Sequence, residues 1–201
     1  LLPNILSQET NWMHTESHLC PWHQTMAFVI RRAPEIAPHA NRFITPLVPF
    51  REGRTVATRM IVNYMLRQPF AKQLKLSRGK IRRAVEQGFR AGDSCGRVML
   101  EKLQETGEPG VVLVGRPYNV HDAGVNLSVA QKLRDFYGVN VIPLDFLDTE
   151  QVDILEINNH MFWDLGRKII ASAKIVGQHD NLHIIYITNF KCGPDSFIKH
   201  F

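Results

Sequence analysis

The chain contains three cysteines, whose thiolates could bind a soft metal or act as nucleophiles. Cys192 comes shortly after a predicted strand and precedes Gly193 and Pro194, so its thiol is expected on a tight loop with open space beside it. Gly193 would let a bulky group approach the backbone closely, and the hydroxyl of Ser196 could donate a hydrogen bond to sulfur. These features favour a functional role for Cys192 over that of an inert, buried thiol.

The other two cysteines have different surroundings. Cys20 precedes Pro21, which can occupy the first position of a helix, so the dipole of that helix would favour a thiolate. Cys95 lies in a stretch of helical periodicity and is expected to be structural. No two cysteines have the close spacing of a zinc ribbon or a bacterial ferredoxin. Cys20 and Cys192 can therefore share a site only if the fold brings them together.

A second cluster, formed by Gly115, Arg116, Tyr118 and Asn119, directly follows the hydrophobic run at residues 111–114. Gly115 allows a sharp turn, and Arg116 offers a planar fork of donors that suits carboxylate or phosphate. Asn119 and Asp122 are expected to cap the helix that follows, over 126–137. Two interpretations stay open: Arg116 binds an anionic ligand, or it pairs with an acidic residue nearby.

The second half of the chain predicts an α/β fold that would position these loops. In a sheet of parallel strands, ligands bind outside the carboxyl ends of the strands, where the loops of Arg116 and Cys192 are expected. Alternating strands and helices with short connections predict a Rossmann-like three-layer fold with a parallel sheet. The predicted strands are 111–114, 139–144 and 183–188, and the predicted helices are 126–137 and 157–176.

The first half predicts a partial α/β domain followed by a helical segment. Residues 1–23 are expected to be irregular, and 43–50 to be extended. Helices are expected from Pro21 to Arg32, over 54–66, and over 77–103 with an interruption near Gly92.

Glycine, proline and charged residues are concentrated at 105–110, which predicts a boundary between domains 1–105 and 106–201. The chain begins without methionine and ends on what resembles the start of a helix. We therefore expect two partial domains, truncated at both ends of the chain and joined by the helical segment.

Composition narrows the class of protein. Hydrophobic residues make up 44% of the chain and charged residues 21%, which is typical of soluble globular proteins. The net charge is +5, but the densest basic cluster, at residues 78–83, lacks interleaved aromatics and indicates a solvated helix face, so no nucleic-acid partner is expected. The sequence has neither an apolar run of about 18 residues nor a signal peptide, so no membrane association is expected. The odd number of cysteines favours a reducing, cytoplasmic location.

Three segments together resemble a known family: Leu19–Trp22, Val114–Asn119 and Asn189–Phe197. They are similar to the dehydratase-like domain of CoA-substrate-specific enzyme activases. That group is related to 2-hydroxyglutaryl-CoA dehydratase, benzoyl-CoA reductase and double-cubane cluster proteins. The resemblance spans nearly the whole chain, and the segment from Cys192 to Phe197 is its most specific part.

The resemblance implies two Rossmann-like domains that hold an iron–sulfur cluster, of 4Fe–4S or double-cubane type, in a cleft between them. It implies that Cys20 and Cys192 are ligands. Because the relatives use at least three cysteines, it also implies a further ligand before Leu1 or beyond Phe201. It also implies that an ATP-dependent activase delivers low-potential electrons to this module. The residues expected to line the cofactor site are Gly115, Arg116, Tyr118, Asn119, Gly193 and Ser196.

We therefore expect an iron–sulfur module that takes part in electron transfer and in the reduction or dehydration of an acyl-CoA or related small substrate. The fragment alone is expected to be inactive, and a homo-oligomeric assembly is compatible with the sequence. Two alternatives stay open. One is a Rossmann-like domain for an anionic ligand such as phosphate or CoA, and the other is a domain that docks an activase partner.

Overall fold

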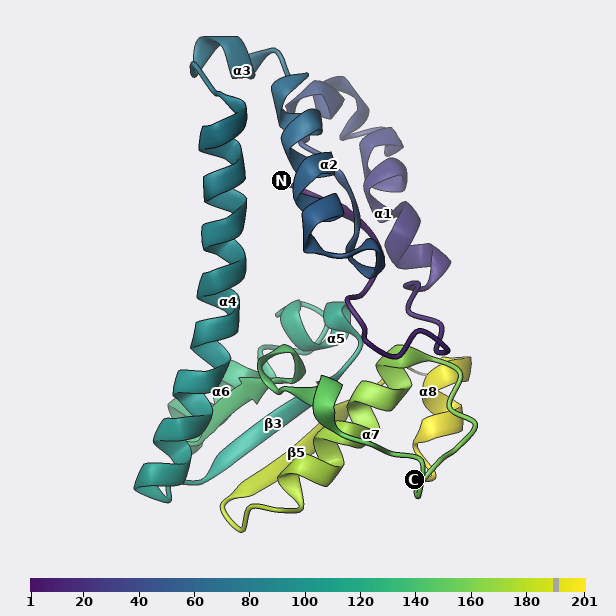
Figure 1. Ribbon diagram of the computed structural model, residues 1–201, viewed down its shortest axis with the longest axis vertical. Helices are drawn as coiled ribbons and strands as arrows, with labels where there is room; N and C mark the ends of the chain where they lie inside the picture. The colour runs from purple at the N-terminus through teal and green to yellow at the C-terminus, as the bar shows by residue number, and fades with distance from the viewer. Residues whose placement is uncertain (190–191) are drawn as a thin grey trace. The chain divides into compact units, whose positions relative to one another are not determined.

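The computed structural model describes residues 1–189 and 192–201, which form two compact units (Figure 1). The first unit comprises Leu1–Asn11 and Ser17–Arg90, and the second comprises Trp12–Glu16 and Ala91–Phe201. Both units combine helices with parallel strands, so the predicted α/β class is confirmed.

The first unit is built on a pair of parallel strands, β1 (Asn4–Ser7) and β2 (Leu47–Pro49). The expectation that the first residues are irregular is wrong for β1, because pairing with β2 holds this short segment extended. The helix α1 (Pro21–Arg32) begins at its proline, as predicted, and lies in the connection between the two strands.

Two longer helices contribute to the first unit. The bounds of α2 (Arg54–Leu66) agree with the prediction. The helix α4 (Arg78–Thr106) runs for 29 residues without the interruption expected near Gly92. A helical glycine costs only about 1 kcal/mol, which a long amphipathic helix tolerates. The shorter elements are η1 (Ala37–Arg42), η2 (Phe50–Glu52) and α3 (Phe70–Gln73).

The division between the two units falls inside α4, between Arg90 and Ala91. The domain boundary predicted at 105–110 lies at the end of this helix and stays a prediction. None of the helices in the described ranges combines the length and the apolar character that a membrane span requires.

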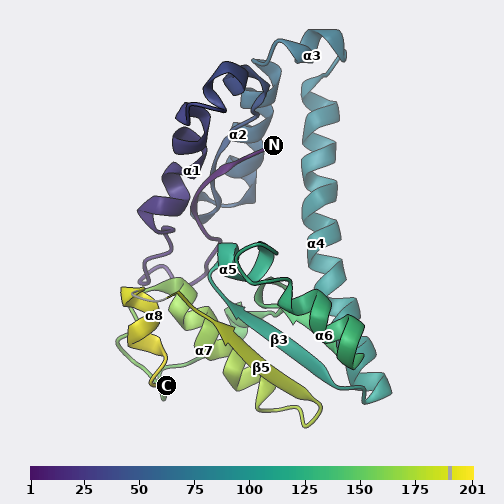
Figure 2. The same cartoon turned by 180° about the vertical axis from the view of Figure 1, so that it is seen from behind.

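The second unit contains the predicted Rossmann-like sheet. Its strands are β3 (Gly110–Gly115), β4 (Asn140–Pro143) and β5 (Leu182–Ile187), all parallel and in the order β4-β3-β5. The helices α6 (Val129–Tyr137) and α7 (Asp164–Val176) lie on opposite faces of this sheet, which gives three layers (Figure 2).

Both of these helices begin later than predicted. Leu127 and Ser128 adopt left-handed backbone conformations, with φ of 56° and 58°, so α6 cannot extend back to residue 126. Before α7, Trp163 pairs with Glu16 in a short parallel bridge, which keeps the chain extended up to Asp164.

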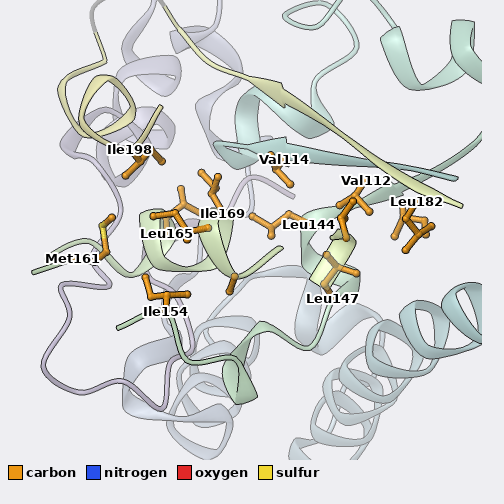
Figure 3. Close-up of a cluster of buried hydrophobic side chains, with 14 of the residues drawn as sticks. Val112, Val114, Leu144, Leu147, Ile154, Met161, Leu165, Ile169, Leu182 and Ile198 are labelled. Atoms are coloured by element: carbon orange, nitrogen blue, oxygen red, sulfur yellow. The ribbon is translucent and has the colours of Figure 1, made fainter. Parts of the chain in front are cut away.

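A continuous hydrophobic core fixes the carboxyl ends of the strands. Every residue of β3 is buried, as expected for the central strand of a covered parallel sheet. Ile198, from the short helix α8 (Gly193–Ile198), belongs to the same core and so anchors the segment that follows Cys192. The core residues labelled in Figure 3 are Val112, Val114, Leu144, Leu147, Ile154, Met161, Leu165, Ile169, Leu182 and Ile198.

The segment Trp12–Glu16 joins the second unit through backbone and side-chain hydrogen bonds. The backbone N–H of Asp164 donates to the carbonyl of Glu16 over 3.0 Å. The indole N–H of Trp12 donates to the carbonyl of Glu150 over 3.1 Å, and the hydroxyl of Thr15 donates to Asp164 Oδ1 over 3.3 Å. A segment near the start of the chain thus completes the surroundings of α7.

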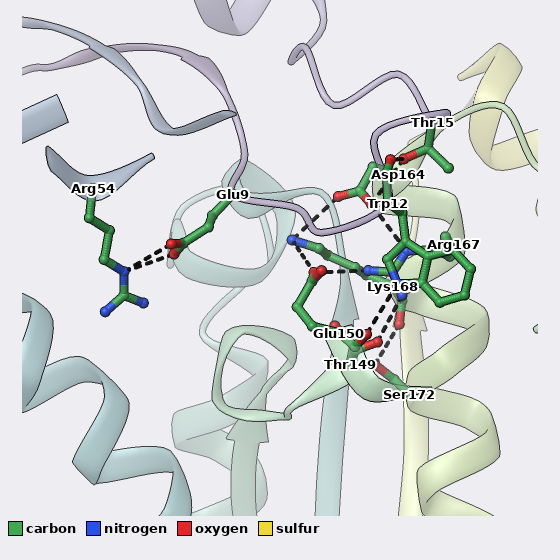
Figure 4. A network of polar contacts seen from close by, with 10 residues as sticks. All are labelled: Glu9, Trp12, Thr15, Arg54, Thr149, Glu150, Asp164, Arg167, Lys168 and Ser172. Atoms are coloured by element: carbon green, nitrogen blue, oxygen red, sulfur yellow. Dashed lines mark hydrogen bonds and ion pairs between the residues drawn. The ribbon is translucent and has the colours of Figure 1, made fainter. Parts of the chain in front are cut away.

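A buried network of charges lies beneath this segment (Figure 4). Arg167 Nε bonds Asp164 Oδ1 over 3.1 Å, and Arg167 Nη2 bonds Glu150 Oε1 over 2.9 Å. Lys168 Nζ lies 3.2 Å from Glu150 and 3.3 Å from Asp164. The guanidinium of Arg167 also lies 5.1 Å from the ring centroid of Trp12. Asp164 and Arg167 are almost completely buried, so their charges depend on one another.

Candidate functional site

The loops that follow β3 and β5 form the candidate site. β3 lies in the centre of the sheet, and the chain passes first to β4 on one side and then to β5 on the other. The topological switch point of the sheet therefore lies between β3 and β5. Open α/β sheets bind ligands outside the carboxyl ends of the strands at such a point. The loop after β3 carries Arg116, and the loop after β5 carries Cys192.

Gly115 brings these two loops together at the end of the sheet. Its φ is +152°, and a Cβ at this position would lie 2.3 Å from the carbonyl oxygen of Ile187. Only glycine permits such an approach between the two backbones. Gly115 therefore determines where the loop of Arg116 leaves the sheet.

Arg116 and Asp195 form a buried ion pair across the two loops. Arg116 Nε donates to Asp195 Oδ1 over 3.0 Å, and the side chains are 9% and 1% exposed. The hydroxyl of Thr188 donates to the second carboxylate oxygen over 2.8 Å. Of the two interpretations of Arg116, pairing with a nearby acid is therefore observed. Asp195, in the first turn of α8, and Thr188 had no role assigned from the sequence.

Arg116 provides a permanent positive charge at this edge of the sheet. Burial lowers the pKa of Arg116, but the charge of Asp195, followed by those of Cys192 and Tyr118, raises it, and the net change is upward. Cys192 and Tyr118 therefore lie within electrostatic reach of the guanidinium.

Cys192 occupies the cap position before α8 and is a free, half-buried cysteine. Its carbonyl accepts a hydrogen bond from the N–H of Ser196 over 2.8 Å, and its N–H donates to Asn189 over 3.2 Å. Among the described residues, no atom outside its chain neighbours would lie within 4 Å of a Cβ on Gly193. Ser196 is exposed on α8. The thiol thus stands at the start of α8, with space beside the next residue.

Asn119 is fully buried within α5 (Pro117–His121), and Ser128 occupies the cap position of α6, so the expectation that Asn119 and Asp122 cap that helix is wrong. Arg116 occupies the cap position of α5 itself, because Pro117 begins that helix. Asn119 Nδ2 donates to the carbonyl of Ile187 over 3.4 Å, whereas its Oδ1 has no hydrogen-bond partner within the described residues. A buried acceptor of this kind is a place for a donor from water or a ligand.

Tyr186 is a further residue of this site that the sequence did not single out. Burial, followed by the charge of Asp195, raises the pKa of its phenol, which therefore stays neutral. The strand periodicity of β5 places Tyr186 two residues before Thr188, on the same face, which is the signal that could have identified it.

The remaining predicted residues are distributed over both units. Tyr118 is half-buried in α5, and Cys95 is exposed on α4. Cys20 is half-buried at the start of α1 in the first unit, whereas Cys192 belongs to the second, so a shared site for the two thiols stays a prediction. Across residues 1–189 and 192–201, no group of three or more histidine, cysteine, aspartate or glutamate side chains could hold a metal ion.

His121 and Asp145 form a second polar contact at this edge of the sheet. His121 ends α5, Asp145 lies in η3 (Leu144–Phe146) directly after β4, and His121 Nε2 is 2.5 Å from Asp145 Oδ2. The hydrogen bond to Asp145 raises the pKa of His121, burial lowers it, and the carboxylate charge adds to the increase, so the net change is upward.

This contact predicts a measurable dependence on pH. An NMR titration should place the pKa of His121 above its ordinary value of 6.5, and Asp145→Asn should lower it again. Since the folded-state pKa is raised, the pair stabilises the fold below pH 6.5, and the effect is lost as the pH rises through the folded-state pKa. Both side chains are about half exposed, so the stabilisation should stay below about 1 kcal/mol. Identical titration curves for the parent and Asp145→Asn proteins would contradict the assignment.

The fold and the site define an α/β protein with a Rossmann-like sheet and a polar cluster at the carboxyl ends of its strands. Residues 1–147 match the family model described as CoA enzyme activase uncharacterised domain (DUF2229). The chain belongs to this family, which confirms the expected relation to CoA enzyme activases. The matched region includes Cys20 and the loop of Arg116, and it ends before α7 and Cys192. No curated protein and no solved structure matches the chain.

Proposed function

We propose that this chain is the part of a CoA enzyme activase protein that holds an iron–sulfur cluster, with Cys192 and Cys20 among the ligands. The observation that carries the proposal is the position of Cys192. It is a free thiol next to the switch point of a parallel sheet, within reach of the positive charge of Arg116. Such a cluster, when bound, would supply a low-potential electron carrier.

The surroundings of Cys192 fit one thiolate ligand of such a group. Gly193 leaves room for a bulky neighbour. The guanidinium of Arg116 would offset part of the negative charge of the sulfur, while Asp195 holds that guanidinium in place. The backbone of Cys192 itself is held by hydrogen bonds to Asn189 and Ser196. These residues would thus orient the thiolate and balance its charge.

Besides the exposed Cys95, the described residues offer the thiol of Cys20 in the first unit and that of Cys192 in the second, which is fewer ligands than a cluster needs. The proposal therefore requires at least one further ligand from a longer polypeptide or from a partner subunit. Family membership supports a functional connection with an activase. We propose that the partner is an ATP-dependent activase domain or protein that delivers electrons, and that the parent protein acts on an acyl-CoA or a related small substrate.

Replacing Cys192 by serine should remove most of the iron from the parent protein. Serine keeps the size of the side chain but is a harder, far less acidic ligand than a thiol. The measurement is the iron and acid-labile sulfide content after anaerobic purification. The matched control is Cys95→Ser, because Cys95 is exposed on α4 and should not affect the iron content. Equal iron in the parent and Cys192→Ser proteins would exclude Cys192 as a ligand.

The second candidate function is the binding of an anion at the same edge of the sheet, such as phosphate or the phosphate groups of CoA. It is favoured by the guanidinium of Arg116, which bonds Asp195 through Nε and whose planar fork of donors suits phosphate oxygens. Absence of iron from both the parent and Cys192→Ser proteins would favour this candidate, or a docking role, over the cluster.

A further inference from the structure

The first unit contains a cavity of about 500 Å³ between α2 and the first half of α4. Its charged lining residues are Arg54 and Arg59 from α2, and Arg78, Arg82, Glu86 and Arg90 from α4. Five arginines thus face the same space against one carboxylate. None of these residues belongs to the site described above.

The spacing of the residues explains how α4 presents its charges. Residues 78, 82, 86 and 90 are separated by four positions each, so they lie on one face of the helix. The sequence indicated that the basic cluster at 78–83 is a solvated helix face. All four basic residues of this cluster are exposed, as predicted, and Arg78 and Arg82 also line the cavity, whereas Lys80 and Arg83 do not.

Several of these guanidiniums are engaged only in part. Arg82 bonds Glu86 over 2.8 Å, and Arg78 donates to the amide oxygen of Asn63 over 3.0 Å. In the part of the chain that the structure describes, Arg59 and Arg90 have no ion pair or hydrogen bond through their side chains. Like charges four residues apart, such as Arg78 and Arg82, destabilise a helix. The cavity lining therefore carries more positive charge than these ion pairs and hydrogen bonds engage.

The cavity lining is partly apolar, and one of its arginines is held in place by contacts. Arg54 is held by Glu9 at 2.9 Å (Figure 4), and its guanidinium lies 5.1 Å from the centroid of the Phe89 ring. Val62 and Thr58 of α2 are both buried at the wall. The cavity thus combines converging guanidiniums with an aromatic and aliphatic surface.

We propose that this cavity binds an organic polyphosphate of nucleotide size. Guanidinium groups match phosphate oxygens in a bidentate geometry, and arginines on two helices can hold more than one phosphate at once. The volume falls within the range of small-molecule sites, and Phe89 with Val62 offers a surface for an organic moiety. The concave shape favours a small ligand over an acidic segment of a partner protein. This proposal goes beyond the function proposed above and does not depend on a cluster.

The proposal is tested by calorimetric titration of the full chain with pyrophosphate, ATP and CoA. The test variant is Arg59→Gln with Arg90→Gln, both exposed residues of the cavity. The matched control is Arg67→Gln with Arg83→Gln, which removes the same charge from exposed positions outside the cavity. Circular dichroism checks that both variants are folded.

We expect ATP or CoA to bind more tightly than pyrophosphate, and whichever binds better identifies the source of the phosphates. The test variant should bind the preferred phosphate ligand at least about tenfold more weakly than the parent protein, while the affinity of the control variant should change by less than about twofold. Absence of binding by all three probes would overturn the proposal, as would an equal loss in the control. Tighter binding of an octaglutamate peptide than of any phosphate would overturn it in favour of an acidic protein partner.

Discussion

Replacing Asp164 by alanine is expected to lower the free energy of unfolding by about 3–5 kcal/mol. Asp164 is fully buried and is an ionic partner of Arg167, which is 1% exposed. Removal of the carboxylate would leave the buried guanidinium with Glu150 as its ionic partner and the carbonyl of Thr149 as a hydrogen-bond acceptor, and a hydrogen bond to Thr15 would be lost as well. Urea unfolding followed by circular dichroism measures the change.

The control for this prediction is Lys174→Ala on the same helix. Lys174 pairs with Glu156 on the surface, where the side chains are 31% and 69% exposed, so its loss should cost less than about 1 kcal/mol. The double variant Asp164→Leu with Arg167→Met removes both charges and should recover much of the stability lost in Asp164→Ala. A loss in Asp164→Ala as small as that of Lys174→Ala would contradict the role assigned to the buried network.

Gly115→Ala is expected to destabilise the protein by about 2–6 kcal/mol. Two effects add: the φ of +152° is strained for alanine, and the new Cβ would meet the Ile187 carbonyl oxygen at 2.3 Å. That carbonyl belongs to β5, which pairs directly with β3, so neither backbone can move aside without disturbing the sheet. The measurement is again urea unfolding.

Gly88→Ala is the matched control for Gly115→Ala. Gly88 lies inside α4, and in the described structure an added Cβ would meet no atom within 4 Å beyond its helix neighbours. This substitution should therefore stabilise the helix by about 0.5–1 kcal/mol. If the free energy of unfolding falls in Gly115→Ala and rises in Gly88→Ala, the loss of stability is caused by the close approach at Gly115 and not by glycine replacement in general. Equal, small effects would be incompatible with the observed contact.

Gly115 and the buried network around Asp164 differ in how well the sequence predicted them. Gly115 was expected to allow a sharp turn, because a glycine directly after a buried strand is typical of a chain that changes direction there. The network of Asp164, Arg167 and Glu150 was not expected, since the region before residue 164 was predicted to be helical. Its contacts with Trp12 and Thr15 link residues 138 and 149 positions apart, respectively, and no local pattern reveals such pairs.

The sequence by itself determined the local elements: the helix from Arg54 to Leu66, the buried central strand and the loops that carry Arg116 and Cys192. Periodicity and turn-forming residues act over a few positions, so they can be recognised from neighbours alone. Only the tertiary structure decided that Asp195 partners Arg116 and that Trp12–Glu16 joins the second unit. Those choices depend on which distant groups meet when the core closes, because a buried charge is stable only beside its partner.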